Sequence, residues 1–139
     1  MDSDIRKKIK ETITLLFVED EGMIIEASLN LLKRRFKEVY TASDGFEGFE
    51  VFKRHRPNII ITDILMPRCN GIEMIRRIRE LDKSVPIVVM TALAENGYVR
   101  MAEKYSIEGY LVKPINEDDF LGLLQNLSID LYTKKFAHD

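Results

Sequence analysis

Four runs of apolar residues in this sequence each end in polar side chains of types that do chemistry. In chain order these side chains are Glu19 with Asp20, Asp63, Thr91 and Lys113. In an open α/β sheet the functional residues lie beyond the carboxyl ends of the strands. If the apolar runs form parallel strands, three carboxylates, a hydroxyl and an ammonium group meet at one edge of the sheet.

Such a group of carboxylates favours a divalent cation. Neighbouring carboxylates repel one another, and without a cation at least one of them has a raised pKa. Magnesium prefers oxygen ligands and is commonly held by one or two carboxylates together with a substrate phosphate. We therefore predict a Mg²⁺ site with Asp20 and Asp63 as direct ligands, and with Glu19 bound directly or through water.

Asp63 is also the candidate nucleophile. It follows the run from Asn58 to Thr62, so we expect its carboxylate to be exposed at a strand tip, and an aspartate can accept a phosphoryl group. Phosphoryl transfer is catalysed mainly by positioning and by neutralising charge on the transferred group. Lys113 would neutralise that charge together with Mg²⁺, and Thr91 would donate a hydrogen bond. Taken singly, these residues also have ordinary structural explanations; Asp20, for example, suits the cap of the next helix equally well.

The spacing between these positions fits a parallel sheet, whose strands are joined by crossovers of a dozen or more residues, usually helical. The gaps from Asp63 to Thr91 and from Thr91 to Lys113 each accommodate one helix and one strand. The gap from Asp20 to Asp63 is long enough for two helices with a further strand between them, and residues 39–42 are a candidate for that strand. The sequence therefore predicts an α/β fold with five strands.

The expected elements follow from apolar runs, helical periodicity and chain breakers. The strands are expected at about 14–18, 39–42, 59–62, 87–90 and 110–112. The helices are expected near 21–36, 45–55, 71–81, 96–105 and from 117 to at least 127. The chain breakers that fall between or at the edges of these elements are Pro57, Pro67, Pro86, Pro114 and the turn Asn70-Gly71.

Composition narrows the functional classes. The 139 residues, 45% of them hydrophobic, suit a single domain. A net charge of −2 gives no electrostatic footprint for direct nucleic-acid binding. No apolar stretch approaches the roughly 18 residues of a membrane span, and the charged segment Met1 to Thr12 is unlike a secretory signal, so we expect a cytoplasmic chain with no membrane partner. Cys69 is the only cysteine, which excludes an internal disulfide.

Together the motifs resemble the receiver domain of two-component response regulators, the CheY-like family. The matching segments are Val18-Glu19-Asp20-Glu21, Asp63-Ile64-Leu65-Met66-Pro67 with Asn70-Gly71, Met90-Thr91-Ala92 and Tyr110-Leu111-Val112-Lys113-Pro114-Ile115. The resemblance runs from about Ile13 to Leu127. It implies a doubly wound, five-stranded parallel sheet of order 2-1-3-4-5 in a flavodoxin-like three-layer sandwich, and dependence on Mg²⁺.

The resemblance also implies what the site residues do. A phosphoryl group passes to Asp63 from the phosphohistidine of a sensor histidine kinase or a phosphotransfer protein, and the domain catalyses its own aspartyl phosphorylation and dephosphorylation. The backbone carbonyl of Leu65 joins the metal ligands. The hydroxyl of Thr91 follows the phosphoryl group and Tyr110 swings inward, which shifts the Thr91 to Tyr110 face between inactive and active states. Two positions depart from the family pattern: Glu19 stands where aspartate is commoner, and Gly109 where an acid often precedes the aromatic residue.

The downstream partner is an output domain or target protein that the sequence does not name. In the family, the surface formed by Asn96 to Lys104 and Glu117 to Leu124 is where members dimerise or contact targets. The main alternative function is a degenerate pseudo-receiver that acts only as a protein-interaction module. Two other classes fit poorly: a haloacid-dehalogenase-like phosphatase needs a second acid where Leu65 stands, and a flavodoxin-like carrier needs a phosphate loop where the acids 19–21 stand.

The two ends of the chain flank this domain. We divide the sequence into a charged leader at 1–12, the receiver domain at 13–127 and a C-terminal helical extension or linker at 128–139. Phe120, Leu124, Leu127 and Leu131 recur at helical spacing, so the last helix can continue past the domain. Two interpretations stay open: a signalling helix that leads to an output module, or a longer final helix that packs on its own domain.

Overall fold

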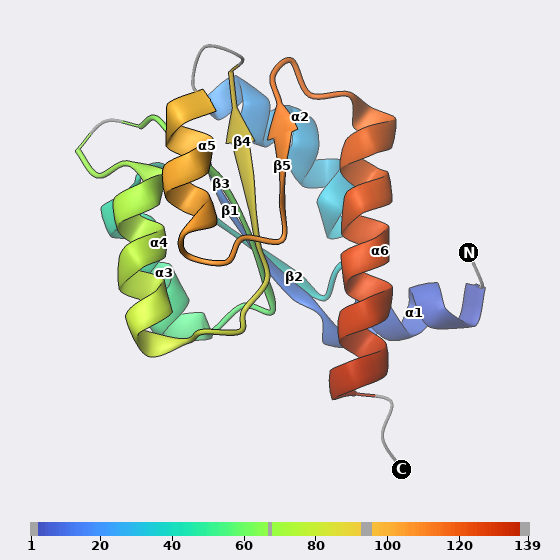
Figure 1. Ribbon diagram of the computed structural model, residues 1–139. Helices are drawn as coiled ribbons and strands as arrows, with labels where there is room; N and C mark the ends of the chain where they lie inside the picture. Colours follow the sequence, from blue (N-terminus) through green and yellow to red (C-terminus); the bar gives the residue numbers. More distant parts are fainter. Residues whose placement is uncertain (1–2, 67, 93–95, 137–139) are drawn as a thin grey trace.

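The structure, a computed structural model, describes residues 3–66, 68–92 and 96–136. It contains a five-stranded parallel sheet in the order β2-β1-β3-β4-β5 (Figure 1). The strands are β1 (Thr14–Val18), β2 (Glu38–Ala42), β3 (Ile59–Asp63), β4 (Ile87–Thr91) and β5 (Gly109–Val112). This architecture confirms the doubly wound α/β fold and the strand order that the sequence predicts.

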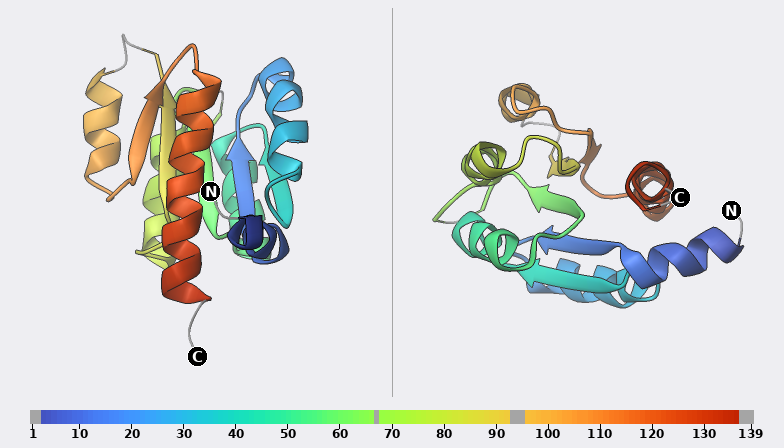
Figure 2. Two further views of the ribbon diagram at one scale, coloured as in Figure 1. Left: turned by 90° about the vertical axis from the view of Figure 1, so that its right-hand side faces the viewer. Right: turned by 90° about the horizontal axis from the view of Figure 1, so that it is seen from below.

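Helices cover both faces of the sheet and make three layers (Figure 2). On one face lie α3 (Gly45–His55), α4 (Gly71–Leu81) and α5 (Asn96–Glu103). On the other face lie α1 (Ser3–Thr12), α2 (Gly22–Lys33) and α6 (Glu117–Lys135). Among the described residues, no helix combines the length and the apolar character that a membrane span requires.

Alternation along the strands explains why the sheet is buried on both faces. Successive side chains of a strand point to opposite faces. In β1, Leu16 and Val18 join the core beneath α3, α4 and α5, whereas Leu15 and Phe17 join the core beneath α1, α2 and α6. All five residues of β3 are buried, as expected for the unbroken apolar run of a central parallel strand.

Two helices end earlier than the periodicity predicts. Helix α2 ends at Lys33 rather than at Phe36, and α5 ends at Glu103 rather than at residue 105. Phe36 is buried in the core, and Lys10 donates hydrogen bonds to the carbonyls of Lys33 (2.6 Å) and Phe36 (3.1 Å). A contact from α1 therefore satisfies carbonyls that another turn of helix would have used.

The two ends of the chain pack against the domain rather than away from it. Residues 3–12 form α1, in which Ile9 is buried, and α6 continues to Lys135. Ser128 is buried, and Leu131 and Tyr132 pack against the same core as Ile9. Figure 2 shows α1 beside the C-terminal half of α6. The predicted loop residue Pro67, the ends 1–2 and 137–139 of the two flanking segments, and residues 93–95 lie outside the described residues.

Candidate functional site

The site lies where four neighbouring strands end. Glu19 and Asp20 follow β1, Asp63 is the last residue of β3, Thr91 is the last residue of β4, and Lys113 follows β5. The register pairs Val18 with Thr62, Asp63 with Met90 and Thr91 with Val112, so these strand ends are level. The parallel sheet thereby brings the sequence-predicted side chains to one edge.

Lys113 is the cation at the centre of this group. Its Nζ lies 2.7 Å from Asp63 Oδ2 and 3.4 Å from Glu19 Oε2. One carboxylate oxygen from each of Glu19, Asp20 and Asp63 lies within 4.8 Å of the others. Four residues from three distant parts of the chain thus form one compact charged cluster.

Asp63 is buried, which corrects the prediction of an exposed strand tip. Only 5% of its surface is exposed, whereas Asp20 is exposed. The reason is that the chain after β3 folds back over it: the Gly71 N–H donates to the Ile64 carbonyl (2.7 Å), which brings the start of α4 against the strand end. A Cβ at position 71 would lie 2.2 Å from the Asp63 carbonyl oxygen, so only glycine permits this approach.

Glu19 is fully buried and incompletely satisfied. Its Oε1 accepts a hydrogen bond from the Glu21 N–H (3.2 Å), but its Oε2 accepts none from the described residues. The 3.4 Å approach of Lys113 is an ion-pair contact without hydrogen-bond geometry. Burial, reinforced by the charge of Asp63 and opposed by Lys113, raises the pKa of Glu19 to about 7.

The electrostatics of Asp63 and Lys113 are mutually dependent. Burial raises the pKa of Asp63, and the hydrogen bond and charge of Lys113 oppose that rise. For Lys113, burial lowers the pKa, but the hydrogen bond and charge of Asp63 together with the charge of Glu19 outweigh it, so the net pKa is raised. Lys113 is therefore charged at neutral pH, where it stabilises negative charge on Asp63.

These carboxylates fit a divalent cation. Within the described parts of the chain, Glu19, Asp20 and Asp63 are the one group of three residues able to hold a metal ion. Their carboxylate oxygens are the hard ligands that such an ion prefers. The buried Oε2 of Glu19 accepts no hydrogen bond from the described residues, and a bound cation would satisfy it. Asp20 does not cap α2, because Glu21 occupies the N-cap position and that cap has no side-chain hydrogen bond. The capping alternative for Asp20 is therefore wrong.

The remaining predicted residues surround the cluster. Thr91 is 1% exposed, and its hydroxyl donates to the Ala92 carbonyl (3.1 Å). Leu65 follows β3 in the loop over the site. Tyr110, on β5, is 52% exposed, so its ring faces outward in this structure. Residues 93–95, within the predicted switch segment from Thr91 to Tyr110, lie outside the described part of the chain.

Sequence reasoning missed Asp44, an acid that helps to fix the loop after β3 beside the site. Asp44 is buried, caps α3 by accepting the Glu47 N–H (2.9 Å), and pairs with Arg68 of the loop after β3. The Glu47 N–H and, more weakly, Arg68 outweigh burial and lower the pKa of Asp44. The Gly45 N–H donates to the Cys69 carbonyl (2.9 Å), which fixes the same loop again. The signal was available, since Asp44 and Glu47 have the spacing of a capping box.

Comparisons with known proteins agree with this geometry. The family model for the response regulator receiver domain matches residues 15–125. The transcriptional regulatory protein CseB of Streptomyces coelicolor is 32% identical over 124 residues, which cover 89% of this chain and 50% of that protein. The uncharacterized transcriptional regulatory protein YesN of Bacillus subtilis is 29% identical over 132 residues, covering 89% of this chain and 36% of that protein. The chain spans about half the length, or less, of these curated relatives.

Solved structures show the same fold. The N-terminal domain of an uncharacterized protein from Wolinella succinogenes has a TM-score of 0.84 and 31% identity, and the match covers 89% of this chain and 100% of that one. The chemotaxis response regulator CheY4 of Vibrio cholerae has a TM-score of 0.74 and 29% identity, with 84% and 98% covered. Sequence similarity and shape thus lead to the same family.

Proposed function

This chain belongs to the response regulator receiver domain family of two-component signalling, and on that premise we propose that it is a switch operated by phosphorylation of Asp63. The observation that supports this most directly is the 2.7 Å contact of Lys113 Nζ with Asp63 Oδ2 inside a cluster of carboxylates. The phosphoryl donor is the phosphohistidine of a sensor histidine kinase or a phosphotransfer protein. The intact acidic and basic set favours this function over a pseudo-receiver.

The transfer follows from the properties of these side chains. A carboxylate oxygen of Asp63 forms a bond to phosphorus while the P–N bond of the donor phosphohistidine breaks, and the imidazole nitrogen leaves with the bonding electrons. Lys113 favours the ionised form of the nucleophile and places a positive charge beside the transferred oxygens. Glu19, Asp20, Asp63 and the backbone carbonyl of Leu65 would hold Mg²⁺, which supplies further neutralisation of charge on the phosphoryl group when bound.

The new charge then acts on the neighbouring strands. A phosphoryl group adds roughly −1.5 to −2 of charge and three acceptor oxygens. The hydroxyl of Thr91 lies at the adjacent strand end and would donate to the phosphoryl group, and the ring of Tyr110, exposed in this structure, would move inward behind it. The face between Thr91 and Tyr110 is therefore the proposed two-state element.

The proposed partner surface adjoins that element. On α5 the side chains of Tyr98 and Met101 are 39% and 47% exposed, and Val112 of β5 is 37% exposed. We propose that the helices from Asn96 to Lys104 and from Glu117 to Leu124 present this face to an output module, a target or a second copy in the cytoplasm. The side chain of Asn96 lies outside the described residues.

A phosphodonor experiment tests the function. The protein is incubated with acetyl phosphate and Mg²⁺, and intact-mass spectrometry follows addition of one phosphoryl group. We expect labelling of the parent, none of Asp63→Asn, and unchanged labelling of the control Asp118→Asn, whose carboxylate is exposed on α6. Chelation of Mg²⁺ should slow labelling at least about tenfold, since the carboxylates are then left without their cation.

Two outcomes would count against the proposal. Labelling of Asp63→Asn at the parent rate would show that another residue accepts the group. Failure of the parent to label, together with an unchanged NMR spectrum on adding beryllofluoride and Mg²⁺, would favour the pseudo-receiver.

A further inference from the structure

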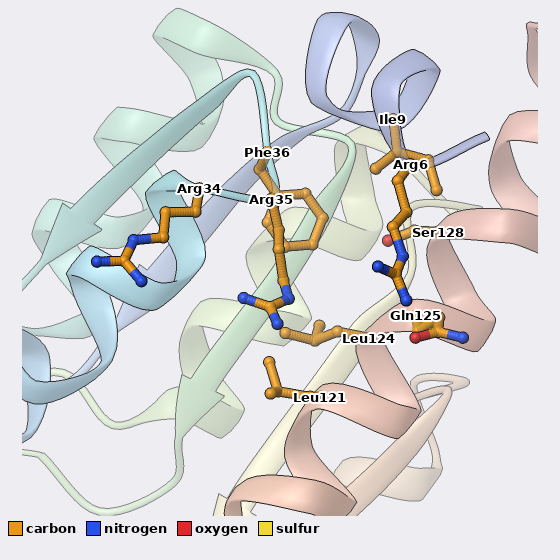
Figure 3. Close-up of a pocket in the computed structure, with 9 residues that line it drawn as sticks. All are labelled: Arg6, Ile9, Arg34, Arg35, Phe36, Leu121, Leu124, Gln125 and Ser128. Carbon is orange, nitrogen blue, oxygen red and sulfur yellow. The ribbon is translucent and has the colours of Figure 1, made fainter. Parts of the chain in front are cut away.

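A hollow lies at the opposite end of the strands from the acidic cluster. Its volume is about 260 Å³, and it opens between α1, the turn after α2, and α6 (Figure 3). Ile9 precedes β1 and Phe36 precedes β2, so the cavity lies at the amino ends of these strands. Residues of the candidate phosphorylation site do not line it.

The floor of the cavity is apolar. Ile9, Phe36 and Leu124 line it and are 4%, 3% and 2% exposed. All three belong to the core that α1, α2 and α6 share. A ligand in this hollow would rest on well-packed side chains and would contact all three helical segments at once.

The rim of the cavity is positively charged. Arg6 of α1 and Arg34 and Arg35 after α2 line it. In the described part of the chain no carboxylate forms an ion pair with these three guanidinium groups, whereas Arg68 pairs with Asp44 and Arg76 with Glu73 and Glu80. Among the described residues, the Arg35 guanidinium donates a hydrogen bond only to the Leu31 carbonyl of α2, at 3.4 Å. Three like charges around one hollow favour an anion.

A buried hydroxyl provides an independent indication of a ligand. Ser128 lines the cavity from α6 and is 1% exposed, and its Oγ has no hydrogen-bond partner among the described residues. A buried hydroxyl without a hydrogen-bond partner is destabilising, and a ligand that accepts its proton would remove that cost. Figure 3 shows the Ser128 oxygen on the cavity side of α6, near Arg6, with the Gln125 amide on the same helix.

We propose that this cavity binds a small organic anion, a carboxylate or a phosphate with an apolar body. The anionic group lies between Arg6 and Arg35, whereas the Arg34 side chain extends away from them in Figure 3, and the Ser128 hydroxyl donates a hydrogen bond to the ligand. The apolar body packs on Phe36. Because ligand pockets usually span roughly 300–1,000 Å³, a cavity of about 260 Å³ suits a single ring or a short acyl chain. Such a ligand would clamp α1, α2 and α6 together, a chemical input separate from phosphorylation.

Calorimetric titration of the full chain in a metal chelator tests this proposal. The probes are hexanoate for a carboxylate, phenyl phosphate for a phosphate, and 1-hexanol as the uncharged control. We expect at least one anion to bind, and the tighter of the two identifies the head group. The double variant Arg6→Ala/Arg35→Ala should bind it at least tenfold more weakly, since the two guanidinium groups on either side of the anion are gone.

Two further variants locate the binding and control for folding. Gln125→Glu places a negative charge on an exposed lining residue and should also weaken binding at least tenfold. Arg54→Ala removes an exposed arginine of α3 that does not line the cavity, and should leave affinity unchanged. Because all these changes are at exposed positions away from Asp63, acetyl phosphate should label every variant as it labels the parent.

The proposal is overturned by any of four results. The first is that neither anion binds with a Kd below about 1 mM, and the second is that 1-hexanol binds as tightly as the anions. The third is that the arginine and Gln125 variants bind the anion with the affinity of the parent. The fourth is that a glutamate-rich peptide binds although neither small anion does. The last result would assign the cavity to an acidic protein partner instead.

Discussion

Glu19 and Asp63 hold ionisable carboxylates in a buried position, with Lys113 as the cation in contact with both. Removing two like charges from water is unfavourable, and one ammonium group compensates for them only in part. The raised pKa of Glu19 is the result of this imbalance. A second cation bound at the site would therefore compensate for the remaining negative charge.

This imbalance predicts how stability depends on pH in the absence of metal. Because the pKa of Glu19 is about 7 in the folded state and 4.5 in an unperturbed glutamate, the folded state keeps a proton that the unfolded chain has released between these values. The contribution of Glu19 to the free energy of unfolding is complete below pH 4.5 and is lost as the pH rises through 7. Urea unfolding in a chelator should show a fall on the order of 2 kcal/mol from pH 5 to pH 8.

Glu19→Gln is the matched control for this pH dependence. The amide cannot titrate, so its unfolding midpoint should fall less than that of the parent over the same pH range. Added Mg²⁺ should restore stability to the parent at pH 8, because the ion binds the ionised carboxylate. An equal decrease of the unfolding midpoint in the parent and in Glu19→Gln would show that the pKa of Glu19 is not raised in the folded state.

At the residue level, the sequence predicted that Glu19, Asp20, Asp63 and Lys113 lie close together. Strand-end placement brought Asp63 and Lys113 together because parallel strands end at one edge. It did not predict the burial of Asp63 or the pairing of Asp44 with Arg68, since both depend on how the loop after β3 folds back. Loop paths leave no periodic signal in a sequence.

At the scale of elements, the junction of β3 and α4 controls the site. Asn70 caps α4 by accepting the Glu73 N–H (2.9 Å), and Gly71 then starts the helix against the Asp63 carbonyl. The backbone that carries the proposed nucleophile is therefore held by the first turn of the next helix. Any side chain at position 71 pushes on that backbone.

Two of the helical glycines, Gly71 and Gly122, give a paired prediction. Gly122 lies in the middle of α6, and a Cβ at that position would meet nothing within 4 Å, so Gly122→Ala should raise the free energy of unfolding by roughly 0.5–1 kcal/mol. Gly71→Ala should lower it by about 1–3 kcal/mol through overpacking. It should also slow acetyl phosphate labelling of Asp63 at least about tenfold, because the nucleophile is displaced.

Chemical denaturation and labelling rates measure both effects. A Gly71→Ala protein as stable and as reactive as the parent would show that β3 and α4 are not tightly interlocked. The ends of α2 and α5 were less predictable than this junction, whose helix starts at Gly71 as the sequence predicts. Helix α2 ends at Lys33, whose carbonyl accepts a hydrogen bond from Lys10, a contact between segments far apart in the chain.

For the whole molecule, the packed helices extend beyond the residues that the family model matches. The family model matches residues 15–125, whereas α1 begins at Ser3 and α6 ends at Lys135. Residues 1–12 contain few apolar side chains, so their pattern predicted only a charged leader. In the fold this segment is a helix that packs on the domain, because Ile9 is buried in the core shared by α2 and α6.

This packing predicts that α1 contributes to the stability of the whole domain. Ile9→Ala should lower the free energy of unfolding by about 2–3 kcal/mol, because it leaves a cavity beside Phe36 and Leu124. Lys7→Ala, an exposed change in the same helix, should stay within about 0.5 kcal/mol of the parent. Urea unfolding of both variants, with the slope against urea unchanged, measures the difference. If Ile9→Ala unfolds like Lys7→Ala, the domain would begin near residue 13 and α1 would be a leader that rests on it.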